Sequence, residues 1–346
     1  MNFKSDNTAP AAPEVLAALA RVNDGAAGNY GDDNVTDRLK TKLSALFEKE
    51  VAVFPVATGT AANALSLATL TPPHGAIFCH EGAHIHVDEC GAPEFYSQGA
   101  KLVPLEGAHG KLTPEAIKAA LAHHQRGVVH HAQPSTISLT QATELGTVYK
   151  PGEIEALARF ARHEQLTLHM DGARFANAIA HLKCSPAEAT WKAGVDALSM
   201  GFTKNGAMAA EAVIFFNPAH ATDIAYRRKR AGHLFSKMRY LSTQIEAMLD
   251  GGLWLKLAGH ANAMATRLAE GLRSVKNVAL EHPVEANELF VRLPSIAAMQ
   301  TLEAAGAKFY EWEPPAEGRP LIRLVCSFST TPSEIDAFLA AARKVG

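Results

Sequence analysis

Short apolar runs alternate with amphipathic stretches from about residue 35 to residue 216. Residues 35–48 carry apolar side chains at positions 35, 39, 43, 46 and 47, a spacing typical of a helix. Continuous apolar runs indicate strands that are buried on both faces. We expect seven such strands, at residues 51–56, 76–79, 101–105, 127–129, 166–170, 197–200 and 212–216. Helices expected between them, including 60–70 and 151–165, predict an α/β fold with a mostly parallel, doubly wound seven-stranded sheet.

The pattern changes after Gly251-Gly252. A long helix is expected over residues 253–275, followed by shorter strands and two further helices. These strands are expected at residues 278–280, 288–291, 307–310 and 321–325, and the helices near 295–305 and 332–345. The sequence therefore predicts a large domain over residues 1–250 and a small C-terminal α+β domain with an antiparallel sheet over residues 251–346.

Composition limits the classes of function. The 346 residues are 47% hydrophobic and 20% charged, with a formal net charge of −2, which gives no electrostatic case for nucleic acid or an anionic membrane surface. No apolar run approaches the ~18 residues of a membrane span, and the first residues lack the apolar stretch of a signal peptide. The four cysteines form no CxxC pair, so we expect buried free thiols in a reducing cytoplasm.

Four segments carry candidate chemistry, and each opens or follows a predicted strand. Because ligands of doubly wound sheets bind at the carboxyl ends of strands, we expect these segments to meet. They are Thr58-Gly59-Thr60-Ala61-Ala62-Asn63, the stretch around His84, Asp171-Gly172-Ala173-Arg174, and Thr203-Lys204.

Together the segments supply what pyridoxal phosphate (PLP) requires of a protein. Gly59 allows close backbone approach at a helix start, where free N–H groups can hold a phosphate. His84 can stack on the cofactor ring, and Asp171 can pair with a protonated pyridine nitrogen. Lys204 can form an imine, and Arg174 can bind a carboxylate through a bidentate fork. Taken singly, each segment also fits an ordinary turn, a surface ion pair or a solvated lysine.

One segment also suggests a different class of enzyme. His80-Glu81-Gly82-Ala83-His84 fits the H-E-x-x-H pattern of zinc hydrolases. That pattern binds zinc only on a helix, where residues i and i+4 share a face. His80 instead ends a predicted strand, and Gly82 is a poor residue for a helix interior. We therefore expect no metal, and a zinc hydrolase remains the alternative from another enzyme class.

With these residues in view, the chain resembles the low-specificity L-threonine aldolases, which belong to PLP fold type I, the aspartate-aminotransferase-like superfamily, and to its β-eliminating lyase group. The likeness runs nearly end to end. It is carried by Ser5-Asp6-Asn7-Thr8, Asn29-Tyr30-Gly31-Asp32-Asp33, the spacing of His84 and Glu89, Asp171-Gly172-Ala173-Arg174, and Lys204 in the place of the Schiff-base lysine.

The resemblance implies a PLP enzyme that cleaves L-3-hydroxy-α-amino acids, such as threonine, allo-threonine or phenylserine, to glycine and an aldehyde. It also implies shared active sites in a homodimer or homotetramer, with the N-terminal segment contributing to the site. The implied catalytic residues are Lys204, His84 and Asp171. The implied cofactor contacts are Gly59, Thr60, His84, Asp171, Thr203, Lys204 and Arg228, the last reaching a neighbouring subunit's phosphate. The implied substrate contacts are Ser5, Tyr30, Arg174 and Arg323.

The chain departs from the family in two segments that bear on the mechanism. The lysine loop reads Phe202-Thr203-Lys204-Asn205-Gly206 rather than the commoner S-K-G-L-G. Many relatives carry an E-N-T-H-N segment whose histidine contacts the substrate hydroxyl, and we place the equivalent here at Gln133-Pro134-Ser135-Thr136, with no histidine. The base that takes the hydroxyl proton is then His84, or a water held by His84, His86 or Glu89. Another β-eliminating lyase or an aminotransferase remains the alternative within PLP chemistry.

Overall fold

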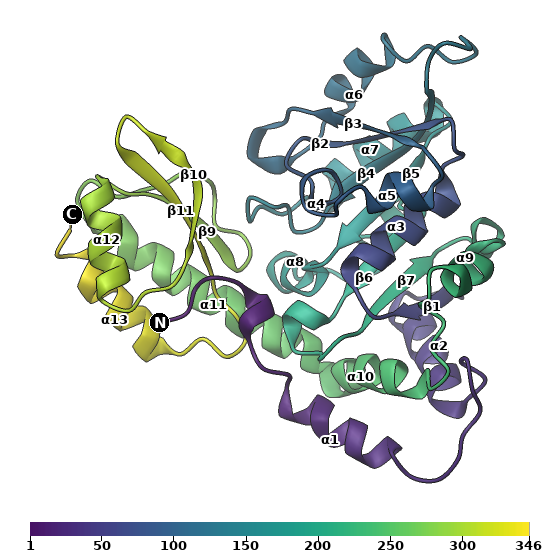
Figure 1. The fold of residues 1–346 in the computed structure, drawn as a ribbon, viewed down its shortest axis with the longest axis horizontal. Coiled ribbons are helices and arrows are strands. Elements are labelled where there is room, and N and C mark those ends of the chain that lie inside the picture. The colour runs from purple at the N-terminus through teal and green to yellow at the C-terminus, as the bar shows by residue number, and fades with distance from the viewer. Residues whose placement is uncertain (346) are drawn as a thin grey trace.

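The computed structural model describes residues 1–345 and contains a seven-stranded sheet in the order β1-β7-β6-β5-β4-β2-β3 (Figure 1). Every neighbouring pair from β6 to β3 is parallel, whereas β7 runs antiparallel to both β6 and β1. The predicted mostly parallel sheet is confirmed. Its strands are β1 (Ala52–Val56), β2 (Gly75–His80), β3 (Lys101–Leu105), β4 (Gln133–Thr140), β5 (Thr167–Gly172), β6 (Ala197–Gly201) and β7 (Glu211–Phe215).

One predicted strand is wrong. Residues 127–129 lie in turns, with Val129 91% exposed, and the strand in this part of the sheet is β4. β4 contains several polar residues, so it does not stand out as an apolar run. Their hydroxyl groups can nevertheless be buried, because they form hydrogen bonds inside the sheet. Ser138 Oγ lies 2.9 Å from His169 Nδ1, and Thr136 Oγ1 lies 2.9 Å from Thr167 Oγ1. Cross-strand hydrogen bonds of this kind allow hydroxyl side chains to be buried.

Helices cover both faces of this sheet. The expected helix at 60–70 is α3 (Gly59–Leu70), which packs on β6 and β7 and is buried along most of its length. Its start is fixed by the side chain of Thr58, whose Oγ1 accepts a hydrogen bond from the Ala61 N–H at 3.1 Å. The other helices of this part are α1 (Pro13–Val22), α2 (Asn34–Leu46), α4 (His84–Val87), α5 (Ala92–Tyr96), α6 (Pro114–Leu121), α7 (Pro151–His163), α8 (Phe175–Leu182), α9 (Ile224–Arg230) and α10 (Arg239–Leu249).

The C-terminal part forms the predicted antiparallel sheet, with four strands in the order β10-β11-β9-β8. They are β8 (Ala279–Leu280), β9 (Glu288–Arg292), β10 (Tyr310–Ala316) and β11 (Arg319–Val325), packed with α12 (Ile296–Ala304) and α13 (Pro332–Ala342). The strand expected at 307–310 is displaced. Lys308 instead bridges to Asn2, and β10 begins at Tyr310.

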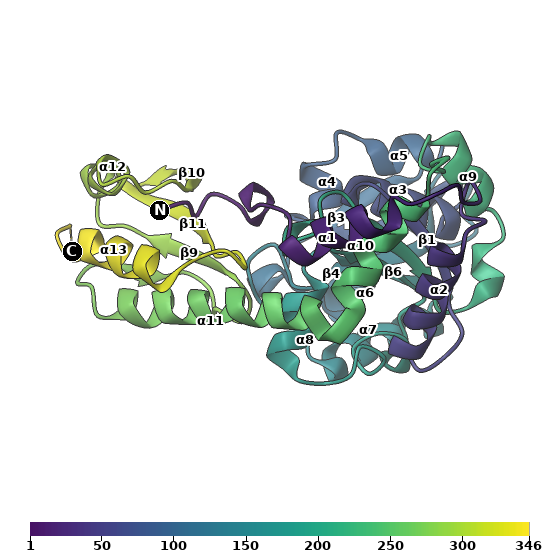
Figure 2. The same cartoon turned by 90° about the horizontal axis from the view of Figure 1, so that it is seen from below.

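A long helix, α11 (Leu253–Arg273), joins the two parts (Figure 2). Leu253 and Trp254 at its start pack into the core of the seven-stranded sheet, whereas Leu268 and Leu272 near its end pack into the core of the smaller sheet. The N-terminal segment also crosses between them, because Phe3 is buried in the smaller core while α1 packs against α10. Both ends of the described chain therefore lie beside the smaller sheet.

The sequence predicted that all four cysteines are free and buried. All four cysteines are free, as expected, but only Cys79 and Cys326 are buried, and Cys90 is exposed. Within residues 1–345, no helix combines the length and apolar character needed to cross a bilayer.

Gly201 gives a test of how closely the strand ends approach one another. A Cβ at this position would lie 2.5 Å from the backbone oxygen of Ala173, so a side chain would push β6 away from the segment after β5. We expect Gly201→Ala to lower the free energy of unfolding by ~1–3 kcal/mol, measured by urea denaturation. Gly259→Ala, in α11 with nothing within 4 Å of the added carbon, should instead be neutral or stabilising. Equal stability of the two variants would contradict the proposed crowding.

Candidate active site

The four segments singled out in the sequence meet at one cavity of about 370 Å³ at the edge of the large sheet where β4, β5 and β6 end. The carboxyl ends of parallel strands lie at the same edge of a sheet, which is why segments more than a hundred residues apart converge. The cavity is lined, among others, by Thr58, Gly59, Thr60, Asn63, His84, Asp171, Arg174, Thr203 and Lys204.

The start of α3 forms one wall of this cavity. The first N–H groups of a helix have no intrahelical acceptor, so those of Gly59 and Thr60 are available to an anion. A Cβ on Gly59 would have nothing within 4 Å, so there is open space beside the Gly59 backbone. The wall therefore suits a phosphate group.

A continuous polar chain forms another part of the cavity lining. The Asn63 side-chain amide donates to Asp171 Oδ2 at 2.7 Å and to Glu89 Oε1 at 2.9 Å. His84 Nδ1 lies 2.9 Å from the same Glu89 oxygen. This bond raises the pKa of His84, and burial raises the pKa of Glu89. The spacing of His84 and Glu89 noted in the sequence thus corresponds to a direct contact that fixes the ring.

Lys204 lies in a short 3-10 turn (Thr203–Asn205) that follows β6. The turn is held by Thr203, whose Oγ1 accepts the Ala210 N–H at 3.2 Å, and by Glu211, whose Oε2 accepts the Phe202 N–H at 2.8 Å. Burial raises the pKa of Glu211 to about 7. The sequence analysis missed Glu211, although a carboxyl at the start of an otherwise apolar run was a usable signal.

A second cavity, of about 480 Å³, opens beside the first and reaches the smaller sheet. Ser5 and Arg323 line this cavity, together with Tyr310 and Trp312. The Arg323 guanidinium lies 4.8 Å from the Trp312 ring centroid and 5.2 Å from that of Tyr310, within the range of cation–π attraction. The predicted substrate contacts Ser5, Arg174 and Arg323 are therefore brought together.

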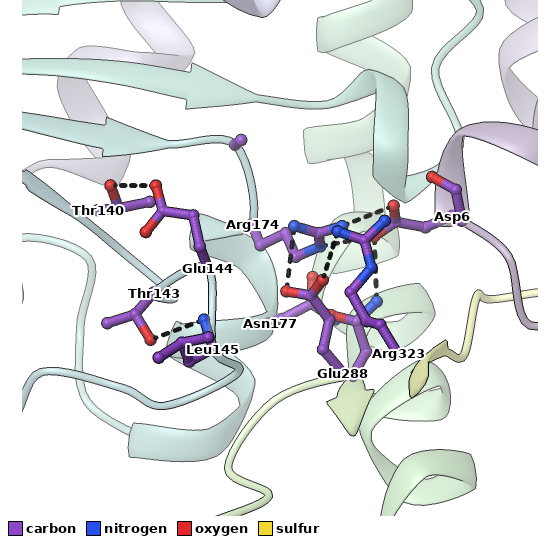
Figure 3. Close-up of polar contacts among 12 residues, drawn as sticks. Asp6, Thr140, Thr143, Glu144, Leu145, Arg174, Asn177, Glu288 and Arg323 are labelled. Carbon is purple, nitrogen blue, oxygen red and sulfur yellow. Dashed lines mark hydrogen bonds and ion pairs between the residues drawn. The ribbon is translucent and has the colours of Figure 1, made fainter. Parts of the chain in front are cut away.

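Arg174 and Arg323 belong to a buried network of four charges that the sequence analysis only half identified (Figure 3). Arg174 binds Asp6 through two parallel bonds, Nε to Oδ2 at 2.8 Å and Nη2 to Oδ1 at 2.9 Å. Glu288 Oε2 lies 3.1 Å from Arg174 Nη1, and its Oε1 lies 3.9 Å from Arg323 Nη1. Burial alone would raise the pKa of Asp6, but the Arg174 guanidinium holds it below its usual value, whereas burial keeps that of Glu288 raised.

Three expected residues lie elsewhere in this chain. Tyr30 is exposed, with Lys229 Nζ 4.7 Å from its ring centroid, and lines neither cavity. Arg228 is buried beside β1, where its Nη1 donates to the Pro55 carbonyl at 3.2 Å and its Nε has no partner among the described residues. His86 is exposed and also lines neither cavity.

The structure corrects the placement of the segment expected to correspond to E-N-T-H-N. Gln133-Pro134-Ser135-Thr136 lies inside β4, so the segment that follows this strand begins at Gln141 and reaches Glu144. Glu144 lines both cavities and accepts hydrogen bonds at Oε1 from the His84 N–H and the Thr140 hydroxyl, each at 2.9 Å. The placement expected from the sequence is wrong because the strand lies at Gln133–Thr140 and not at residues 127–129.

The zinc alternative is not supported by the geometry. His80 ends β2, and its ring contacts the Gly107 carbonyl at 2.9 Å through Nε2. α4 begins only at His84, so the two histidines do not share a helix face. Within residues 1–345, no cluster of three or more His, Cys, Asp or Glu side chains is arranged to hold a metal ion.

Comparison with known proteins agrees with this geometry. A family model described as "Beta-eliminating lyase" matches residues 2–295. The chain is 46% identical over 328 residues to the low specificity L-threonine aldolase of Pseudomonas aeruginosa, covering 95% of this chain and 93% of that protein. The chain belongs to the β-eliminating lyase family.

Further relatives place the chain beside the threonine aldolases of this family. It is 42% identical to the low specificity L-threonine aldolase of another Pseudomonas species, over 99% of this chain and 97% of that one. A solved structure of Leishmania major threonine aldolase superposes with a TM-score of 0.93 at 28% identity, covering 100% of this chain and 99% of the other. The fold is that of PLP fold type I enzymes, and this lyase family uses PLP.

The residues present fit that cofactor. The anion-binding start of α3, the carboxylate of Asp171, the His84 ring and the Lys204 amine all line one cavity. These groups match, respectively, a phosphate, a pyridine nitrogen, a flat ring and an aldehyde carbon. PLP is therefore the cofactor for which this β-eliminating lyase is built.

The buried charge network gives a test of stability. Asp6→Asn removes one of the two carboxylates that face Arg174, and we expect a loss of ~3–5 kcal/mol in the free energy of unfolding. Because the pKa of Asp6 is lowered in the folded protein, its stabilising effect is present above about pH 4 and is lost as the pH falls through its folded value. The difference between wild type and variant should therefore narrow on acidification in urea denaturation series.

The matched control is Asp37→Asn, which removes an exposed ion pair with Lys40. That substitution should cost less than ~1 kcal/mol. A loss for Asp6→Asn as small as that of the control would contradict the structural role of the network.

Proposed function

We propose that this chain is a PLP-dependent aldolase that cleaves L-3-hydroxy-α-amino acids to glycine and an aldehyde. The observation that carries the proposal is the joining of the two cavities. One holds Lys204 and Asp171, the other holds Arg323, and Arg174 lines both. The sequence relationship to low specificity L-threonine aldolases supports the same reaction.

The residues around the first cavity would hold the cofactor. In this proposal the Gly59 and Thr60 N–H groups hold its phosphate, Asp171 faces its ring nitrogen, and His84 stacks on its ring. Lys204 attaches it covalently, with Thr203 shaping the turn. When bound, PLP supplies an electron sink that accepts the electron pair of the broken carbon–carbon bond.

The second cavity would hold the amino-acid substrate. Arg174, Arg323 and Ser5 bind its carboxylate, which leaves the amine directed toward Lys204 and the Cβ hydroxyl at the junction of the cavities. Asp6 and Glu288 hold the two guanidinium groups in place before the substrate arrives, so the positions of the donors are fixed in advance. We expect this preorganisation to orient the Cα–Cβ bond for cleavage.

The residues outside the cavities support an oligomer. Arg228 and Tyr30 lie away from this chain's own site, and we propose that they complete the site of a neighbouring subunit in a homodimer or homotetramer.

We further propose the division of the chain into residues 1–250 and 251–346, with α11 packing on both parts. The four free cysteines support a cytoplasmic location.

Lys204→Ala tests the proposed chemistry. The holoenzyme should release aldehyde from L-threonine or L-phenylserine, and the variant should release none, because no other amine among the described residues lines the cavity and could attach the cofactor. Borohydride treatment should add the cofactor's mass to the wild-type chain but not to the variant. Lys118→Ala, at an exposed position of α6, serves as the control and should behave as wild type.

Two outcomes would count against the proposal. Near-normal aldehyde release by Lys204→Ala would contradict the role of Lys204. Absence of aldehyde from either substrate with wild-type holoenzyme would leave PLP binding intact but favour a different β-eliminating reaction or an amino transfer.

A further inference from the structure

The two cavities share five side chains, those of Asn7, His84, Glu144, Arg174 and Lys204. In the proposed function the substrate spans both cavities, with its amine near Lys204 and its carboxylate near Arg174. The Cβ hydroxyl then lies at this junction, so the group that takes its proton is to be sought among the five.

Four of the five are poorly suited to accept that proton. The Asn7 amide is not a base, and the Arg174 guanidinium stays charged at any working pH. Lys204 is the amine that holds the cofactor. The His84 ring is bonded at Nδ1 to Glu89, and this bond raises its pKa, which favours the protonated ring.

Glu144 is held in a way that leaves one carboxyl oxygen available (Figure 3). Its Oε1 accepts two hydrogen bonds of 2.9 Å, from the His84 N–H and from the Thr140 hydroxyl. Its Oε2 is buried and has no hydrogen-bond partner among the described residues. A buried carboxyl oxygen without a partner is uncommon in proteins and is satisfied when a ligand brings a donor.

The environment of Glu144 also gives it a suitable proton affinity. Burial raises its pKa to about 7, and the negative charge of Asp171 acts in the same direction. A general base works best when its pKa is close to the operating pH, because it is then both largely available and basic enough to accept the proton.

We propose that Glu144 is the catalytic base that takes the proton from the Cβ hydroxyl of the substrate, an assignment that rests on the proposed aldolase function. Glu144 Oε2 receives the proton, and the oxygen's electron pair forms the aldehyde C=O as the Cα–Cβ bond breaks. PLP, when bound, would supply the sink for the electron pair of that bond until Cα is protonated. One proton leaves the substrate and one is added, so the step yields glycine and an aldehyde with no other reactant.

Glu144→Gln tests the proposal in the holoenzyme. The glutamine keeps the size of the side chain and an oxygen for the His84 N–H and the Thr140 hydroxyl, but it cannot take a proton. Aldehyde release from L-threonine should fall ~10²–10⁴-fold. Exchange of the glycine Cα hydrogen in D₂O requires Lys204 and the cofactor but no Cβ hydroxyl, so its rate should stay within about threefold of wild type.

The pH profile supplies a second readout. Wild-type kcat/KM should fall as the pH drops below about 7, because protonation removes the base. This fall should disappear in Glu144→Gln and persist, at a lower rate, in Glu144→Asp, which keeps a carboxyl group. Glu115→Gln, at an exposed position of α6, is the matched control and should keep both the rate and the profile.

The outcomes separate this inference from the proposed function. If wild type cleaves threonine and Glu144→Gln cleaves it equally well with an unchanged profile, Glu144 is not the base. If Glu144→Gln loses glycine exchange together with cleavage, its role is structural and the inference is overturned. If wild type releases no aldehyde at all, the failure belongs to the proposed aldolase function.

Discussion

The buried ion pair between Arg174 and Asp6 is the contact on which the geometry of the site depends. Its two side chains come from the segment after β5 and from the N-terminal segment, and Glu288 on β9 adds a second carboxylate from the smaller sheet. A charge removed from water is costly unless it meets a partner in good geometry. The folded state is therefore most stable when the N-terminal segment and the smaller sheet both pack against the edge of the large sheet at which its parallel strands end.

The same network explains how the guanidinium groups of Arg174 and Arg323 can be largely buried before a ligand binds. Two guanidinium groups face two carboxyl groups, so the site carries little excess charge before a ligand arrives. The two carboxyls differ, because Arg174 lowers the pKa of Asp6 whereas burial raises that of Glu288. When a further carboxylate enters, Glu288 is thus the group that gives up its negative charge more readily, and Asp6 keeps Arg174 oriented.

The sequence predicted those parts of the fold that depend on local pattern. Apolar runs located six of the seven strands of the large sheet, and glycine and polar residues after them located the first cavity. The pattern failed at β4, where Ser138 and Thr136 are buried because the His169 ring and the Thr167 hydroxyl on β5 form hydrogen bonds with them. Asp6, Glu144 and Glu288 were missed as site residues for a related reason. Their contacts include residues that are distant in the sequence, 60 positions away for Glu144 and up to 281 positions away for Asp6, and no local pattern reveals such contacts.

The distribution of acids around the first cavity has a physical consequence for anion binding. Glu89, Glu144, Asp171 and Glu211 all line a space suited to a phosphorylated cofactor, and four fixed negative charges would oppose that ligand. Burial raises the pKa of the three glutamates, to about 7 for Glu144 and Glu211, so part of this charge is absent near neutral pH. The start of α3 carries no acidic residue, and the four carboxyl groups lie on other parts of the cavity lining. Desolvation thus lowers the repulsion toward an anionic ligand and leaves Glu144 and Glu211 with pKa values at which they can exchange protons near neutral pH.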